Sequence, residues 1–222
     1  MSNETNNSTG NKLLFWGCFI ALITTAFAFI TRAFLVNTPD LWPTAFGLNA
    51  VQGQELFGAG IWPFAISIIA FSLIIDKVGY KTAMIFSFIC YAVYAGMAFM
   101  AHGIVSGVEG EALTAAQGKA YGYLYWGSVV LGLGNGTVEA FINPVVATMF
   151  RREKTKWLNI LHAGWPGGLV LGALGNEIYF HVLILGNARD DLVIKFLHAP
   201  VAICGFGKFF VNAIEALSNG LQ

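Results

Sequence analysis

The chain has 222 residues, of which 56% are hydrophobic and only 11% charged, and its mean hydropathy is +0.66. A soluble domain usually carries about 25% charged residues, so this composition indicates a membrane protein and argues against a cytosolic enzyme, a coiled coil or a disordered chain. The 12 Lys and Arg residues balance the 12 Asp and Glu residues, and no net charge favours binding to nucleic acid.

Apolar stretches long enough to cross a membrane follow a polar tail at residues 1–12. A spanning helix needs about 20 largely apolar residues, and five stretches qualify: 13–36, 56–75, 83–102, 125–149 and 157–184. We therefore expect an all-α polytopic membrane protein whose helical bundle covers residues 13–184. In the irregular segment 185–222, a sixth candidate at 192–217 is interrupted by Lys195, His198, Pro200, Lys208 and Glu215, which are costly near the bilayer centre.

Basic residues in the short loops predict the orientation of the chain. The tail and the loops at 76–82 and 151–156 carry seven of them: Lys12, Lys77, Lys81, Arg151, Arg152, Lys154 and Lys156. The opposite loops carry only Lys119 and Arg189. Because loops rich in Lys and Arg stay in the cytoplasm, we expect a cytoplasmic N-terminus in the inner cell membrane, with residues 37–55 and 103–120 outside.

Small residues recur at intervals of four in the last two of these spans. Gly132 and Gly136 form one such series, and Gly164, Gly168 and Gly172 form another. Residues four apart share a helix face, and small residues on that face let a neighbouring backbone approach closely. The spacing predicts tightly packed helices in a bundle.

Six polar residues lie within or near the ends of the spans: Arg32, Asn135, Glu139, Asn143, Asn159 and His162. An ionisable side chain there costs about 2.5 to 3.5 kcal/mol on insertion scales, so such residues usually face the bundle interior or a wet pathway. Asn135, Glu139 and Asn143 follow one another at intervals of four and form a stripe on one helix face. The stripe lines either a solute pathway or a hydrogen-bonded network that locks the helices together.

Two of these residues have more than one interpretation. Arg32 lies a little over a turn from the outer end of its span, so it either extends to the interface or pairs with Glu139 across the bundle. His162 is either a satisfied interior histidine or a group that titrates near neutral pH.

A short motif between the second and third spans resembles the signature loop of the major facilitator superfamily. That loop reads Gly, three residues, Asp, a basic residue, any residue, Gly and then basic residues. Here Asp76, Lys77, Gly79 and Lys81 match it, while Ser72 and Tyr80 differ from it. The resemblance implies a membrane transporter.

The fourth and fifth spans are similar to the fucose:proton symporter family within that superfamily, in which an acidic residue precedes Asn-Pro by four positions and Leu-Asn opens the next span. Glu139, Asn143-Pro144 and Leu158-Asn159 carry this pattern. The resemblance implies transport of a sugar with protons, with Glu139 as the protonation site. His162 and Trp165 occupy fifth-span positions where the family has amides that face the sugar, and Arg32 lies about where its first-span acid stands. The substrate pathway is therefore expected to include Arg32, Asn135, Asn143, Asn159, His162 and Trp165.

The length of the chain matches one half of such a transporter, because a full member has two six-helix halves. We expect either a half-size transporter that forms a homodimer or binds a second half, or a truncated remnant or accessory subunit that does not transport. An enzyme is not expected, because HExxH, GxSxG and phosphate-binding loop motifs are missing from the sequence. Cys18, Cys90 and Cys204 lie in apolar runs and predict packing residues, with no metal or other cofactor.

Overall fold

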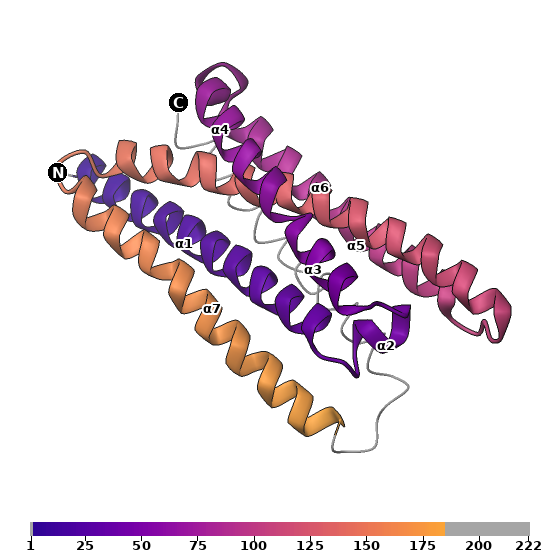
Figure 1. The fold of residues 1–222 in the computed structure, drawn as a ribbon. Helices are drawn as coiled ribbons and strands as arrows, with labels where there is room; N and C mark the ends of the chain where they lie inside the picture. Colours follow the sequence, from indigo (N-terminus) through magenta and orange to yellow (C-terminus); the bar gives the residue numbers. More distant parts are fainter. Residues whose placement is uncertain (1, 185–222) are drawn as a thin grey trace.

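The computed structural model describes residues 2–184, and every regular element in that range is an α helix (Figure 1). The range contains α1 (Ser2–Asn37), α2 (Trp42–Phe46), α3 (Ala50–Gly58), α4 (Ile61–Val78), α5 (Tyr80–Val105), α6 (Glu111–Met149) and α7 (Lys154–Ile184). The segment 185–222, with its sixth candidate span at 192–217, lies outside the described residues.

Four segments of the described chain are long and apolar enough to cross a membrane: Lys12–Asn37, Ala50–Val78, Tyr80–Val105 and Glu111–Met149. The predicted all-α fold is confirmed for the described residues, and four of their segments are candidate membrane spans. α7 is long, with 31 residues, but its many glycines and its polar residues lower its mean hydropathy. A fifth span at α7 stays a prediction.

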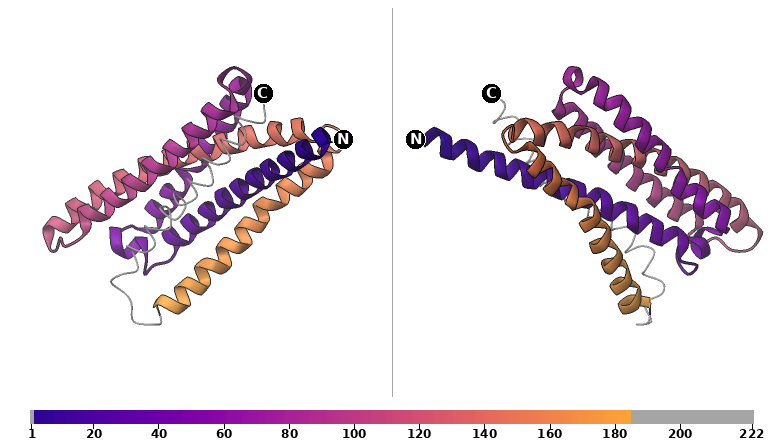
Figure 2. Two further views of the ribbon diagram at one scale, coloured as in Figure 1. Left: turned by 180° about the vertical axis from the view of Figure 1, so that it is seen from behind. Right: turned by 60° about the vertical axis from the view of Figure 1, so that its left-hand side comes forward.

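The helices form two groups. α6 packs along α4 and α5, while α1 packs along α7, and the two groups meet where α6 also contacts α1 and α7 (Figures 1 and 2). Each end of the bundle has its own apolar core. Near the α6–α7 turn, Phe15, Leu22, Ile142 and Leu161 are among the buried residues; at the opposite end, the core includes Leu41, Trp42, Phe46, Leu56 and Leu124.

The glycine series bring these helices together as the spacing predicts. A Cβ atom at Gly132 would overlap the carbonyl oxygen of Gly60, just before α4, and one at Gly136 would overlap the carbonyl oxygen of Phe64 in α4. A Cβ atom at Gly168 would lie 2.6 Å from the Ile23 carbonyl oxygen of α1. The prediction of close backbone approach is confirmed at both interfaces, and these contacts fix α4 against α6 and α1 against α7.

The second predicted span is not one continuous helix. The stretch 56–75 begins inside α3 and crosses a break at residues 59–60 before α4 begins at Ile61. Pro63 lacks the N–H group that would bond to the Ala59 carbonyl, and Gly58 and Gly60 favour a helix end, so the sequence around the break disfavours a continuous helix.

The segments predicted to be outer loops are largely helical. Residues 37–55 contain α2 and most of α3, which begins with an Asn49–Gln52 capping box. Residues 103–120 contain the end of α5 and the first turns of α6, so only residues 106–110 form a turn. Ala116 and Ala120 are buried there, and this packing extends α6 beyond its apolar stretch.

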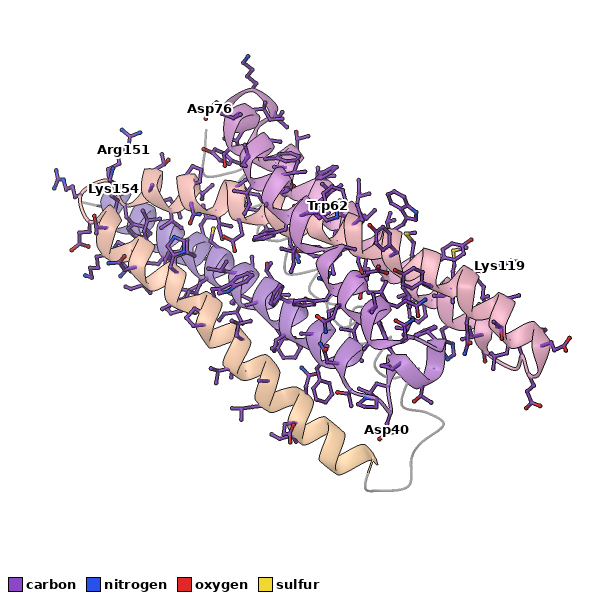
Figure 3. All side chains as sticks on the ribbon, in the orientation of Figure 1. Asp40, Trp62, Asp76, Lys119, Arg151 and Lys154 are labelled. Atoms are coloured by element: carbon purple, nitrogen blue, oxygen red, sulfur yellow. The ribbon has the colours of Figure 1, made fainter. Side chains whose placement is uncertain are left out.

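Large apolar side chains cover the outside of the bundle. Exposed examples are Ile66, Ile69 and Leu73 on α4, Ile85, Ile89 and Val93 on α5, and Val170, Leu171 and Leu174 on α7. The labelled charged residues lie toward the ends of the bundle, with Asp76, Arg151 and Lys154 at one end and Asp40 and Lys119 toward the other (Figure 3). This distribution suits a bundle surrounded by lipid between two polar layers.

Candidate functional site

A cluster of polar side chains lies in the interior of the bundle, about midway along α6. The Tyr91 hydroxyl of α5 donates a 2.7 Å hydrogen bond to the Asn135 Oδ1 atom of α6. The Thr25 hydroxyl of α1 also lies near the Tyr91 hydroxyl, and Glu139 follows Asn135 by one turn on the same face of α6. Asn135 is 6% exposed and Thr25 only 1%, so three helices bring polar groups together in a buried place.

Glu139 is the acidic group of this cluster. Its side chain is half-buried, and within the described residues its carboxylate has no hydrogen bond or ion pair. The sequence correctly placed Asn135 and Glu139 on one helix face, but it gave no indication that Tyr91 joins them. In a sequence, a tyrosine within an apolar run looks like a packing residue. Only the structure shows which group its hydroxyl bonds to.

Asn143 continues the polar stripe one turn further along α6. Its Nδ2 atom donates a 3.2 Å hydrogen bond to the Glu139 carbonyl oxygen, while its Oδ1 atom is buried and has no partner within residues 2–184. A buried amide oxygen without a hydrogen bond is uncommon in native proteins. The stripe is therefore only partly satisfied by the helices that surround it.

Arg32 behaves in neither of the two predicted ways. Its residue is 4% exposed, so it does not extend to the interface, and it forms no ion pair with Glu139. Instead its Nη2 atom donates a 2.9 Å hydrogen bond to the Phe57 carbonyl oxygen at the end of α3, and its guanidinium lies over the Phe57 ring, 5.4 Å from the centroid. The break between α3 and α4 exposes this carbonyl and makes the bond possible.

Trp165 of α7 belongs to a group of aromatic rings next to Arg32. Its ring centroid is 6.0 Å from that of Phe29 on α1 and 6.3 Å from that of Phe64 on α4, and Phe29 is 4.9 Å from Phe57. All four residues are partly exposed. The structure thus brings one predicted pathway residue, Trp165, close to another, Arg32, through two phenylalanines.

Asn159 and His162 do not join the cluster. Both side chains are exposed on α7. They are not buried by the described residues, because the α7 face that packs on α1 is the glycine face and these two residues lie off it. Both therefore present polar groups on the outside of the described bundle.

Other polar contacts, which the sequence did not single out, join the helices in pairs. The Asn176 Nδ2 atom of α7 donates a 3.0 Å hydrogen bond to the Thr31 hydroxyl of α1, and the Ser67 and Thr137 hydroxyls lie 2.9 Å apart between α4 and α6. All four residues are buried. Asn176 follows the glycine series at the same interval of four, so its place on the packed face was detectable from the sequence.

The signature-loop residues lie at the sharp turn from α4 to α5. Gly79 has a φ of 81° and is the single residue between the two helices; this left-handed backbone favours glycine. Asp76 and Lys77 are exposed in the last turn of α4, and Lys81 is exposed in the first turn of α5. These residues therefore lie far from the polar cluster, at one end of the bundle (Figure 3).

Among the described residues, no group of three His, Cys, Asp or Glu side chains is placed to hold a metal ion. No protein family, curated protein or solved structure matches this chain. A function for this chain can therefore be proposed only from the residues of the bundle.

Proposed function

We propose that this chain is one half of a major facilitator transporter that moves a small polar solute, of the sugar class, across the inner cell membrane with protons. The observation that carries the proposal is the interior polar cluster of Tyr91, Asn135 and Glu139 in a bundle of candidate membrane spans. An ionisable group inside a membrane bundle is costly and usually serves a solute or ion pathway.

The broken helix supports the same proposal. Transporters often use discontinuous spanning helices at their substrate sites, because backbone that is not helical is tolerated where it lines a cavity. The α3–α4 break lies beside Arg32 and near the aromatic group of Phe29, Phe57, Phe64 and Trp165. A locked structural network would instead satisfy its buried polar atoms, whereas the Asn143 Oδ1 atom has no partner in the part of the chain that the structure describes.

The exposed polar side chains of α7 support a partner. Asn159 and His162 lie among apolar neighbours such as Ile160 on the outside of the described bundle, where contact with lipid is unfavourable. A second six-helix half, or a second copy of this chain, would cover them and complete a central pathway.

The test is accumulation driven by a pH gradient in proteoliposomes, using the chain with any second half that co-purifies and a panel of labelled sugars. Glu139→Gln keeps the shape of the side chain but cannot ionise, so it should abolish accumulation above the external concentration while exchange of bound solute persists. Glu111→Gln, at the exposed start of the same helix, is the matched control and should transport normally.

Two outcomes would reject the proposal. Full accumulation by Glu139→Gln would remove this carboxylate from the coupling, and a lack of uptake of every polar solute by a folded assembly would remove the transport function itself.

A further inference from the structure

We propose that the transported solute carries a carboxylate group and that Arg32 is the residue that selects it. The inference rests on the transport function proposed above and narrows its substrate class to acidic sugars and similar acids. It starts from the charge of Arg32 and from the groups that surround it.

The Arg32 side chain is a buried cation that has no counter-ion in the described part of the chain. Within the described residues the ion pair is that of Lys156 with Glu153, both at the exposed α6–α7 turn, so no carboxylate lies within 4.0 Å of Arg32. The groups that do face the guanidinium are neutral: the Phe57 carbonyl oxygen, the Phe57 ring, the Tyr94 hydroxyl and the backbone at Gly60. Buried charges in proteins are normally paired, and among residues 2–184 no anion pairs with this one.

One donor of the guanidinium is also unused. The Nε atom is buried and has no hydrogen-bond partner among the described residues, whereas Nη2 donates to the Phe57 carbonyl oxygen. Arginine presents its N–H groups as a planar fork that matches the two oxygens of a carboxylate. A bound carboxylate would supply both the absent negative charge and an acceptor for Nε.

The aromatic group beside Arg32 gives the rest of such a solute a place to bind. Partly exposed rings of Phe29, Phe57, Phe64 and Trp165 lead from the guanidinium toward α7. The faces of aromatic side chains are apolar and suit the apolar face of a sugar ring. A sugar acid stacked on these rings would direct its carboxylate toward Arg32.

The experiment compares sugars that differ only in a carboxylate. The melting temperature of the purified protein in detergent is measured with D-glucose against D-glucuronate and with D-galactose against D-galacturonate. The acid of at least one pair should raise the melting temperature more than its neutral partner. Arg32→Gln should weaken binding of that acid by at least about tenfold, Arg32→Lys should retain part of it, and Arg151→Gln, which changes an exposed arginine, should leave it unchanged.

Each shift is measured against the unliganded melting temperature of the same variant, which separates a loss of binding from a loss of stability. Equal or larger shifts with the neutral sugars, no shift with either acid, or an unchanged shift in Arg32→Gln would overturn the inference. If Arg32→Gln does not fold, the inference is tested by the shifts that the paired sugars produce in the wild-type protein and in Arg32→Lys. Uptake of a neutral sugar but not of its acid would reject this inference while leaving the transport function intact.

Discussion

Tyr91 is the side chain that joins the polar cluster across the α5–α6 interface. Its hydroxyl donates to the buried Asn135 Oδ1 atom at 2.7 Å, and the Thr25 hydroxyl lies nearby. A buried acceptor that loses its donor keeps the desolvation cost without the compensating bond. The cluster therefore depends on this one hydroxyl for both its stability and the position of Asn135.

Removing that hydroxyl should destabilise the bundle. Tyr91→Phe keeps the ring but leaves Asn135 Oδ1 without its donor, at a cost of about 1 to 3 kcal/mol. We expect a lower melting temperature in detergent. Tyr123→Phe, on a partly exposed tyrosine of α6, is the control and should change the melting temperature little; equal effects of the two variants would show that the hydrogen bond does not stabilise the protein.

Some single-residue features could be predicted from the sequence and others could not. Asn135 and Glu139 could be assigned to one helix face from their spacing of four, because helix geometry alone determines which residues share a face. The interaction of Arg32 was not predictable in this way, since its acceptor is a backbone carbonyl 25 residues away and that carbonyl is available only because the helix ends there. Contacts made by backbone at a helix break leave no pattern in side-chain spacing.

At the scale of helices, glycine decides which pairs pack. α4 lies against α6 where Gly132 and Gly136 remove the Cβ atoms that would meet its backbone. The sequence predicted this because a small residue at every fourth position has a direct geometric meaning. It did not predict that α6 extends back to Glu111, because the early turns of that helix are held by packing on α5 and carry little apolar pattern.

A matched pair of substitutions tests the α4–α6 contact. Gly136→Ala places a Cβ atom against the Phe64 carbonyl oxygen and Ser67, so we expect a destabilisation of about 1 to 3 kcal/mol, typical of overpacking. Gly122→Ala on the same helix meets nothing within 4 Å and should be neutral or stabilising by up to about 1 kcal/mol through helix propensity. Thermal unfolding in detergent measures both, and a Gly136→Ala variant as stable as Gly122→Ala would contradict the close approach.

At the scale of the whole molecule, the two ends of the bundle differ in charge. Lys77, Lys81, Arg151, Arg152, Lys154 and Lys156 lie at the end formed by the α4–α5 and α6–α7 turns. Both turns therefore belong on the cytoplasmic side if basic residues set the orientation. The fold is consistent with this arrangement because it brings the two basic turns to the same end (Figure 3).

Cysteine labelling measures the orientation directly. After removal of Cys18, Cys90 and Cys204, Ser106→Cys in the α5–α6 turn should react with a membrane-impermeant thiol reagent added to intact cells. Thr155→Cys at the start of α7 should react only after the membrane is opened. Both positions are exposed, so accessibility within the protein does not limit the reaction; labelling of Thr155→Cys in intact cells would reverse the predicted topology.

Because α6 is long, a small tilt of the α5–α6 hairpin would move its ends by several ångströms. With 39 residues at about 1.5 Å each, α6 is about 58 Å long, well beyond the roughly 30 Å of a hydrocarbon layer. α5 packs along it, which stiffens the projecting part. A tilt of this pair by about 10° around the midpoint of α6 would therefore displace the turn at 106–110 by about 5 Å. Rocking about this midpoint during a transport cycle would displace both ends of α6 by the same distance, and a spin label in the turn at 106–110 would report the motion at one of them.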